Sequence, residues 1–527
     1  MALWADWRHT NRMKTQIASS ISVVGLLVTV VFTSGCGGSS SEPGGVVTPP
    51  PPGVPLPTIT SFTATPSRIT SDQTTSLTWS VSGAQSISID QGVGAVSGTS
   101  TIVTPGSTRT YTLTATNSAG RTSTATTSVT VTGGIAGITL TWNTGSTVKL
   151  EQVIGDKDWA AWARGTTLPT ASQTATRYNI LGTDIGTSFE SNGTLMILFG
   201  DILPATPAPN FGAPDPVAFS STMDGDVPLQ LSVVTGADGR TPLFIRMPGS
   251  GIDMGGNNVP NAGISLSDGV YIVINTGATP TTGQTNARSV LVRFNQAAGT
   301  FTAGRTISQM PGGRFVFTSL RAFGSDVYMF GTGNYRASDI YLSVTPASEF
   351  WAGTGTRYYA GRVNGQPTWS ASETAAVPIV VDNPLNSANY SPTVGNLTVG
   401  YSTDLGLWIM TFDGGRQSGA TGGFYFTYAK EPTGPWTSPQ LIFNPTRDNA
   451  LGVYIHNPNA VPSDGLTGPT IGPNTDPVTS PGAAYAPMLI ERFTRMIGNT
   501  LKIYYLNSTW NPYTVVKMRS EFTIGRP

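Results

Sequence analysis

The chain has 527 residues, of which 62 are glycine and 39 are proline, and 38% of its residues are hydrophobic. This length allows two to four domains, and the composition suits a turn-rich all-β protein with few long helices. The 29 lysines and arginines balance the 29 aspartates and glutamates, so no net field attracts a polyanion such as nucleic acid. We therefore expect a neutral partner.

The first 36 residues are typical of an export signal. Arg8, Arg12 and Lys14 precede the apolar run 17–32, and Cys36 follows a short stretch of small residues. The run is shorter than the ~20 apolar residues that a membrane-spanning helix requires. This order resembles a bacterial lipoprotein signal. It predicts lipidation of Cys36 and an exported outer-membrane or cell-surface lipoprotein that touches the membrane only through its lipid; a plain secretory signal is the alternative.

Two segments follow the signal. Residues 37–56 are rich in glycine, serine and proline and predict an extended spacer. From 57 to 132, short alternating segments recur with turn residues between them, which is typical of a small β-sandwich. Trp79 and Tyr111 resemble the buried tryptophan and the late-strand tyrosine of bacterial immunoglobulin-like domains. We expect this domain to act as a stalk, with carbohydrate binding as the alternative role.

The remainder, 138–527, contains five apolar segments, most of them preceded by a short turn. This rhythm predicts five antiparallel sheets, each with one of the segments as its middle strand. Five such sheets can close radially into a five-bladed β-propeller, which has short protected edges and a central channel. Two packed sandwiches are the alternative. The segments are 195–200, 270–275, 327–331, 407–412 and 501–506.

Two aspartates are the candidates for acid–base chemistry. Asp184 stands at the expected start of the first blade's inner strand, and Asp201 follows the next strand, with a turn predicted at 192–193. The antiparallel return would bring both carboxyl groups to one face, and cleavage of a glycosidic bond requires such a pair. Desolvation of an aspartate near Phe199 would favour the acid role. We assign Asp201 as acid and Asp184 as base or nucleophile; turn aspartates that cap backbone N–H groups are the alternative.

Binding of a neutral sugar chain needs flat apolar faces for the sugar C–H surfaces and planar donors for the hydroxyl groups. Aromatic residues beside arginine or asparagine are therefore the candidates, with blade packing as the alternative for each aromatic. Arg321 would be an inward-pointing charge on a strand and requires a partner, for which the two aspartates are candidates. The predicted substrate-binding residues are Arg321, Tyr335, Arg336, Asn389, Tyr390, Trp510 and Asn511.

Metal-ligating side chains are scarce. One cysteine excludes an internal disulfide framework, and two histidines leave little for a metal centre, so we predict no metal or other cofactor for the chemistry. His456 is expected to form ordinary hydrogen bonds, and a structural cation held by His456 with backbone oxygens or water is the alternative. Asp253, between Gly251 and Gly255, is a further possible carboxylate, for which a loop turn is the commoner explanation.

Six short motifs occur in order along the large domain. They are Gly182–Gly186 with Leu198–Asp201, Arg288–Leu291, Gly331–Arg336, Val394–Val399 with Leu407–Trp408, Ala429–Trp436, and Ser508–Tyr513. Together they resemble five-bladed D-arabinan-degrading enzymes, glycoside hydrolase family 183, a family long catalogued only as a domain of unknown function. The resemblance implies hydrolysis of α-D-arabinofuranosyl linkages in D-arabinan, the neutral furanose polymer of arabinogalactan and lipoarabinomannan.

One position departs from that family's pattern. Where we expect Gly-Glu-Leu-Ser, this chain has Gly395–Thr398 with asparagine at 396, which removes a carboxylate. The prediction is a secreted or lipid-anchored glycoside hydrolase of the endo-D-arabinanase type. Two alternatives stay open: a hydrolase of L-arabinan or another pentose polymer, and a surface glycan-binding protein that lacks the chemistry.

Overall fold

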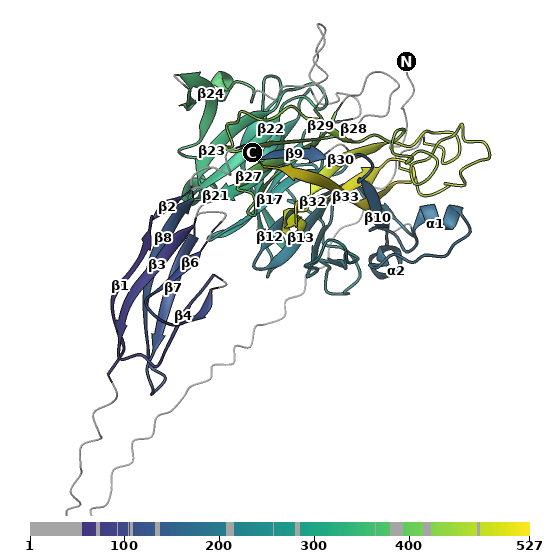
Figure 1. Cartoon of the computed structure of the whole chain (residues 1–527). Helices are drawn as coiled ribbons and strands as arrows, with labels where there is room; N and C mark the ends of the chain where they lie inside the picture. Colours follow the sequence, from purple (N-terminus) through teal and green to yellow (C-terminus); the bar gives the residue numbers. More distant parts are fainter. Residues whose placement is uncertain are drawn as a thin grey trace, which may run out of the picture. The chain divides into compact units, whose positions relative to one another are not determined.

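The computed structural model describes residues 55–526 except 70–73, 92, 104, 106–108, 132–136, 207–214, 257, 280–284, 364, 380–393, 415–422 and 472–474. The predicted signal segment with Cys36, and the predicted binding residues Asn389 and Tyr390, lie outside the described residues. The fold is all-β, as predicted (Figure 1). Short helical turns complete it: α1 (Trp159–Ala163), α2 (Thr174–Tyr178), η1 (Ala347–Glu349), η2 (Glu373–Ala375) and η3 (Glu491–Phe493). Across the described residues, we find no helix of the length and apolar character needed to span a bilayer.

The strands that follow residue 57 form a two-sheet sandwich. One sheet has the order β1 (Thr58–Thr65), β3 (Thr75–Ser82), β6 (Ser100–Val103); the other has the order β2 (Arg68–Ile69), β8 (Thr122–Val131), β7 (Arg109–Thr116), β4 (Ser86–Ile89), β5 (Gly94–Val96). Alternate residues point inward, so Leu77, Trp79, Tyr111 and Leu113 are buried in one shared core. The assignment to immunoglobulin-like domains stays a prediction.

Five further sheets form the blades of a propeller. Blades 1 and 2 have four strands each: β12 (Ile185–Ser191), β13 (Thr194–Phe199), β15 (Val217–Ser220) and β16 (Ser232–Val233) in blade 1, and β17 (Pro260–Leu266), β18 (Gly269–Thr276), β19 (Arg288–Asn295) and β20 (Thr300–Gln309) in blade 2. Blade 3 has five strands, β21 (Phe317–Phe323), β22 (Asp326–Thr332), β23 (Tyr341–Pro346), β24 (Arg357–Val363) and β25 (Gln366–Ser370). Blade 4 again has four, β26 (Leu397–Ser402), β27 (Leu407–Gly414), β28 (Gly423–Ala429) and β29 (Gln440–Phe443). Blade 5 contains β30 (Ala484–Leu489), β32 (Thr500–Thr509), β33 (Thr514–Gly525), β10 (Val148–Gln152), with β9 (Thr139–Trp142) and β31 (Arg495–Ile497) at its margins. A small two-stranded sheet, β11 (Ile180–Gly182) and β14 (Leu203–Pro204), flanks blade 1.

The first strands of the five sheets, β12, β17, β21, β26 and β30, each contact the next, and β30 contacts β12. This ring is closed, which confirms the propeller and excludes the two-sandwich alternative. The fifth blade joins the two ends of the domain, because β9 and β10 from its N-terminal end pair with the C-terminal strand β33. Pairing of the two ends removes the free edges that an open array of sheets would expose.

The five predicted apolar segments are the second strands of the five blades, which confirms that prediction. They are apolar on both faces because each blade packs between two others. In β18, Ile272 and Ile274 pack in a core shared with blade 1, whereas Tyr271 and Val273 pack in a core shared with blade 3. Burial of both faces is why these strands read as continuous hydrophobic runs rather than as alternation.

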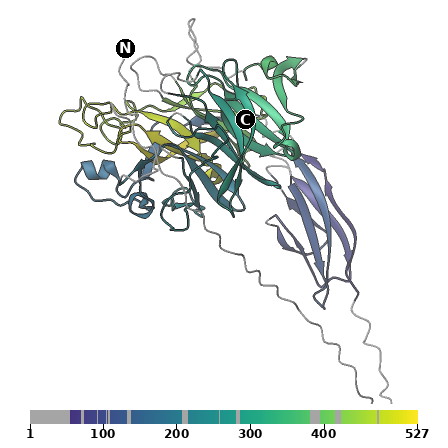
Figure 2. The same cartoon turned by 180° about the vertical axis from the view of Figure 1, so that it is seen from behind.

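The long connection between β29 and β30, residues 444–483, lies on the same side of the propeller as α1 and α2 (Figures 1 and 2). Arg164, directly after α1, donates a hydrogen bond to the carbonyl oxygen of Val453 in this connection (3.4 Å). Gly465 packs against Ala163, because a Cβ at Gly465 would lie 3.2 Å from the Ala163 carbonyl oxygen. The connection is therefore held against the entry helices of the propeller.

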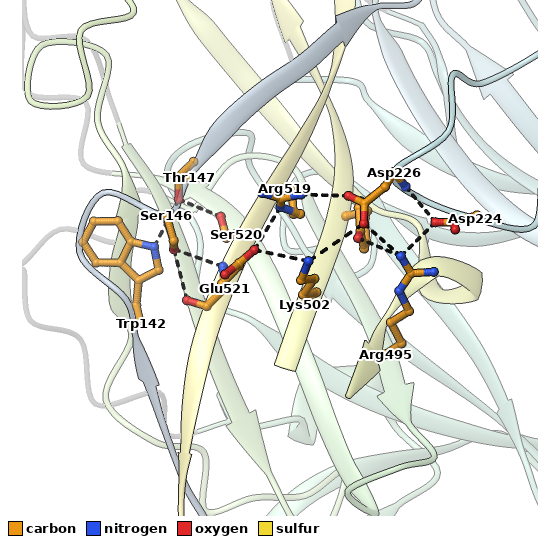
Figure 3. A network of polar contacts seen from close by, with 11 residues as sticks. Trp142, Ser146, Thr147, Asp224, Asp226, Arg495, Lys502, Arg519, Ser520 and Glu521 are labelled. Carbon is orange, nitrogen blue, oxygen red and sulfur yellow. Dashed lines mark hydrogen bonds and ion pairs between the residues drawn. The ribbon is translucent and has the colours of Figure 1, made fainter. Parts of the chain in front are cut away.

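Blade 1 is tied to blade 5 by a network of charges (Figure 3). Asp226 lies between β15 and β16 of blade 1, and its two oxygens accept from Arg519 (2.8 Å) and Arg495 (2.9 Å) of blade 5. Lys502 and Glu521 extend the same network along β32 and β33. An ion-pair network with shared partners contributes more than isolated surface pairs do.

We predict that Asp226→Asn lowers the free energy of unfolding by about 1 kcal/mol, because two arginines lose their shared carboxylate partner. Denaturant unfolding of the full chain at low salt and in 1 M NaCl measures this, and the difference should shrink in high salt. Asp326→Asn is the control. Asp326 lies at a hairpin tip and forms no ion pair in the described part of the chain. A loss of equal size at both salt concentrations would contradict the electrostatic explanation.

Candidate active site

Asp184 and Asp201 are brought together by the predicted hairpin. Strand β12 follows Asp184 and pairs antiparallel with β13, which ends two residues before Asp201, and the turn lies at 192–193. The Gly200 N–H donates to the Asp184 carbonyl oxygen (3.0 Å), and the Thr183 hydroxyl donates to the Gly200 carbonyl oxygen (2.9 Å). The two aspartates therefore occupy adjacent chain segments at the end of the channel where the inner strands begin.

Gly200 leaves room for the Asp184 carboxyl group. A Cβ at Gly200 would lie 2.1 Å from Asp184 Oδ1, far inside van der Waals contact, so only glycine fits the Phe-Gly-Asp motif here. The next residue, Ile185, has a φ of 65°, a conformation that β-branched residues rarely adopt. Its N–H donates to the Ser508 hydroxyl of blade 5 (2.8 Å), which holds this strained turn in place.

A third carboxyl group, Asp215, lies beside the pair, and the sequence analysis missed it. Asp215 stands two residues before β15, and the Phe199 N–H donates to the Pro216 carbonyl oxygen (3.1 Å), which aligns Asp215 with the end of β13. Its side chain is fully buried, and neither oxygen has a hydrogen-bond partner among the described residues. An aspartate just before the next strand of the same blade was the available signal, although spacing alone does not distinguish it from a turn aspartate.

Burial raises the pKa of all three carboxyl groups. Desolvation raises the pKa of Asp184 to about 6, although the hydroxyl groups of Tyr485 and Tyr513 oppose the rise. Desolvation, together with the charge of Asp184, raises the pKa of Asp201 to about 8. The pKa of Asp215 is raised well above its usual value, first by desolvation and then by Asp201 and Asp184. Because three adjacent carboxylates repel one another, they cannot all ionise, and they share protons near neutral pH.

Solvent reaches the three groups to different extents. Asp184 is partly exposed, Asp201 is 7% exposed and Asp215 is 0% exposed. Part of Asp184 is exposed to solvent, although the protein surrounds it closely enough for desolvation to be the largest cause of its raised pKa. Asp184 and, to a small extent, Asp201 are therefore open to a bound molecule, whereas Asp215 is closed to it.

Two buried tyrosines from blade 5 position the pair. The Tyr485 hydroxyl donates to Asp184 Oδ2 (2.9 Å), and the Tyr513 hydroxyl donates to the Asp201 carbonyl oxygen (2.8 Å). Trp510 lies against Tyr513, with 6.0 Å between the ring centroids, and 37% of Trp510 is exposed. Its indole therefore forms part of the rim beside the carboxyl groups, as expected of a sugar-binding aromatic.

A second arc of polar groups comes from blades 3 and 4. Arg336 forms an ion pair with Asp413 (3.2 Å), and its guanidinium lies 4.5 Å from the Tyr335 ring centroid and 6.0 Å from that of Tyr485. The Tyr335 hydroxyl donates to Asn396 Oδ1 (2.9 Å), and the Asn396 N–H donates to Asp413. Burial raises the pKa of Asp413, and Arg336 opposes that rise. Tyr485 joins this arc to Asp184.

Two predicted binding residues lie elsewhere. The side chain of Asn511 is fully buried and donates to the Ser480 carbonyl oxygen (2.8 Å), so its amide supports the fold rather than a ligand. Arg321, on the inner strand β21, pairs with Glu491 (2.8 Å) and not with either aspartate. Near it, Arg492 pairs with Glu190 at the end of β12. These charges gather where the inner strands end, whereas Asp184 precedes the start of β12.

The other residues that the sequence singled out have structural explanations. His456 is buried, with Nδ1 2.9 Å from Asp464 Oδ1 and Nε2 2.8 Å from the Val478 carbonyl oxygen, so both ring nitrogens already have partners. Asp253 is exposed in a turn, where its backbone exchanges hydrogen bonds with Thr276. Trp408 and Trp436 are buried in the core between blades 3 and 4.

We predict that Asp215→Asn raises the melting temperature by at least about 2 °C at pH 8, with a smaller gain at pH 5. The raised pKa means that the native state holds a proton that the unfolded chain loses above its ordinary pKa, so the aspartate costs more stability as pH rises. Thermal unfolding at both pH values measures this, with the exposed Asp253→Asn as control. An equal gain at both pH values, or a loss, would contradict the assigned cause.

A protein family matches most of the large domain. Residues 170–519 match the family described as Domain of unknown function (DUF4185). No curated protein matches the sequence.

Three solved structures illustrate the structural similarity. An α-L-arabinofuranosidase of Podospora anserina has 12% identity and a TM-score of 0.34 over 73% of this chain and 98% of its own. An endo-arabinase of Bacteroides thetaiotaomicron has 11% identity and a TM-score of 0.36 over 68% and 98%. An α-L-arabinanase of Cellvibrio cellulosa has 11% identity and a TM-score of 0.33 over 64% and 91%. At this distance, neither activity nor substrate is transferred to this chain.

Proposed function

The chain belongs to the DUF4185 family, and we propose that it is a glycoside hydrolase that cleaves α-D-arabinofuranosyl linkages in D-arabinan. One observation carries the proposal: two adjacent carboxyl groups, Asp184 and Asp201, have pKa values of about 6 and about 8. Near neutral pH one is mainly ionised and the other mainly protonated. Glycosidic cleavage needs this combination, because one group protonates the leaving oxygen while the other activates water or attacks the sugar.

The geometry supports a specific division of roles. Asp201 acts as the acid, and Asp184, held by the Tyr485 hydroxyl, acts as the base or nucleophile. Asp215 is fully buried and does not contact the sugar; desolvation and the charge of Asp184 keep Asp201 protonated. Trp510 offers an apolar face to the sugar, Arg336 offers donors to its hydroxyl groups, and the Tyr335 ring packs against the guanidinium of Arg336.

The choice of D-arabinan rests on the resemblance of the six motifs to the D-arabinan-degrading family. The balanced charge of the chain agrees with a neutral polymer. Incubation with D-arabinan from arabinogalactan and, separately, with L-arabinan tests the choice by release of oligosaccharides. Release from L-arabinan alone would replace the proposed substrate.

We predict that Asp184→Asn and Asp201→Asn each reduce hydrolysis of D-arabinan by about 10²–10⁴-fold or more, because an amide can neither accept nor donate the required proton. Initial rates of oligosaccharide release measure the loss, and thermal unfolding shows that each variant folds. Asp253→Asn, an exposed aspartate near the site, is the matched control and should retain activity. Near-normal activity in either variant would remove that residue from the mechanism.

The pH dependence follows from the same pair. Activity should rise as Asp184 ionises through about pH 6 and fall as Asp201 loses its proton through about pH 8, which makes kcat/KM bell-shaped between these values. Rates measured from pH 4 to 10 test this, since a macroscopic profile reports the coupled pair. A profile that is flat between pH 5 and 9 would contradict the assignment.

A surface glycan-binding protein is the second candidate function, and one observation favours it. Asn396 stands where the related family is expected to carry glutamate, and its side chain accepts from Tyr335 at the edge of the site. Binding of D-arabinan without any product would support this candidate. In that case Asn396→Glu is the variant with which to look for restored hydrolysis.

A further inference from the structure

A cavity of about 590 Å³ lies in the long connection that precedes β30, outside the site described above. Two short segments, 456–459 and 478–482, form most of its wall, together with Leu451. Amide and hydroxyl groups alternate with apolar surfaces around it, and no lysine, arginine, aspartate or glutamate lines it. The polar members are Asn457, Asn459 and Thr479, and the apolar members are Pro458, Val478 and Pro481.

This cavity adjoins the rim of the carboxyl site through a short run of contacts. Gly482, in its wall, packs so closely that a Cβ would lie 2.4 Å from the Asn511 carbonyl oxygen. The carbonyl oxygen of the next residue, Ala483, accepts a hydrogen bond from the backbone N–H of Trp510 (2.9 Å). Trp510 in turn lies against Tyr513, which donates to Asp201. Trp510 therefore lies between a segment that lines the cavity and the tyrosine that contacts Asp201.

The floor of the cavity is held in place by buried polar groups. His456, which is 3% exposed, joins the two lining segments by its contact with the Val478 carbonyl oxygen (2.8 Å). Its other ring nitrogen contacts Asp464, which also accepts from the Asn457 N–H (2.7 Å). Asn511 anchors the second segment through the Ser480 carbonyl oxygen. A wall that is ordered before binding loses little entropy when a ligand enters, which favours a binding role.

From this arrangement we infer that the cavity is a distal subsite that binds sugar units of the same polymer chain whose linkage lies between Asp184 and Asp201. The inference rests on the proposed function, since it needs a polymeric substrate. An uncharged wall with amide groups and apolar faces matches a neutral sugar chain and disfavours a phosphate or a charged peptide. The volume exceeds that needed for water alone, because a single water occupies about 30 Å³.

Asn459→Trp tests the subsite, because Asn459 is exposed at the cavity wall and an indole there would fill the space. Binding is measured in the Asp201→Asn background, by retardation in gels that contain D-arabinan, so that no product forms. The dissociation constant should rise about tenfold, and in the active enzyme the KM for the polymer should rise similarly. Thr479→Trp fills the cavity from the facing segment and should act in the same way.

Asn499→Trp is the matched control, since it places the same indole at an exposed turn between β31 and β32 of the same blade. It should leave both the retardation and the KM unchanged, and melting temperatures show whether each variant folds. Equal binding by all tryptophan variants would overturn the distal subsite and leave hydrolysis, measured separately, to decide the proposed function.

Two other outcomes separate the two claims. Retardation that Asn459→Trp abolishes, without hydrolysis by the unaltered chain, would support the subsite and overturn the proposed chemistry. No retardation of the Asp201→Asn protein would overturn the subsite, even if the unaltered chain hydrolyses the polymer.

Discussion

Closure of the ring between blade 5 and blade 1 is the constraint on which the site depends. Each blade packs its two faces into cores shared with its neighbours, and the last of these cores joins Leu195 and Ile197 of blade 1 to Tyr504 and Leu506 of blade 5. The carboxyl groups belong to blade 1, and the tyrosines that hold them belong to blade 5. The proposed chemistry therefore sits on the seam, and it exists only when β9 and β10 have paired with β33.

Favourable and unfavourable electrostatic interactions both occur where blade 1 meets blade 5. On the outer side of this seam, Asp226 is shared by arginines from blade 5, and these paired charges favour closure. At the channel end, three adjacent carboxyl groups are desolvated, and this arrangement disfavours the folded state as they ionise. Unfavourable burial of ionisable groups is common at sites where a protein needs a perturbed pKa. The extensive apolar cores between blades offset it.

The candidate binding surface is asymmetric around the carboxyl pair. On one side, Arg336 is held by Asp413 and flanked by tyrosine rings, which is a rigid and charged arrangement. The other part of the surface consists of the exposed indole of Trp510 and the uncharged cavity. A furanose chain presents hydroxyl groups and C–H faces in alternation, so both kinds of wall can contact one substrate at different units. The Asn396 substitution changes the charge of the first side only.

The sequence alone determined the all-β class, the number of blades and the hairpin that joins Asp184 to Asp201. These depend on local patterns: apolar runs buried on both faces, turns between strands, and a two-residue loop that sets the register. Tertiary structure decided the rest of the site. Arg336 with Asp413, and Arg321 with its partner Glu491, come from segments far apart in the chain that only the assembled propeller brings into contact. Asp215 belongs to the same blade as the pair, but its burial beside them is visible only in the folded structure. Burial of Asn511 was equally invisible in the sequence, because an asparagine that binds a sugar and one that braces a loop have the same chemistry and differ only in what surrounds them.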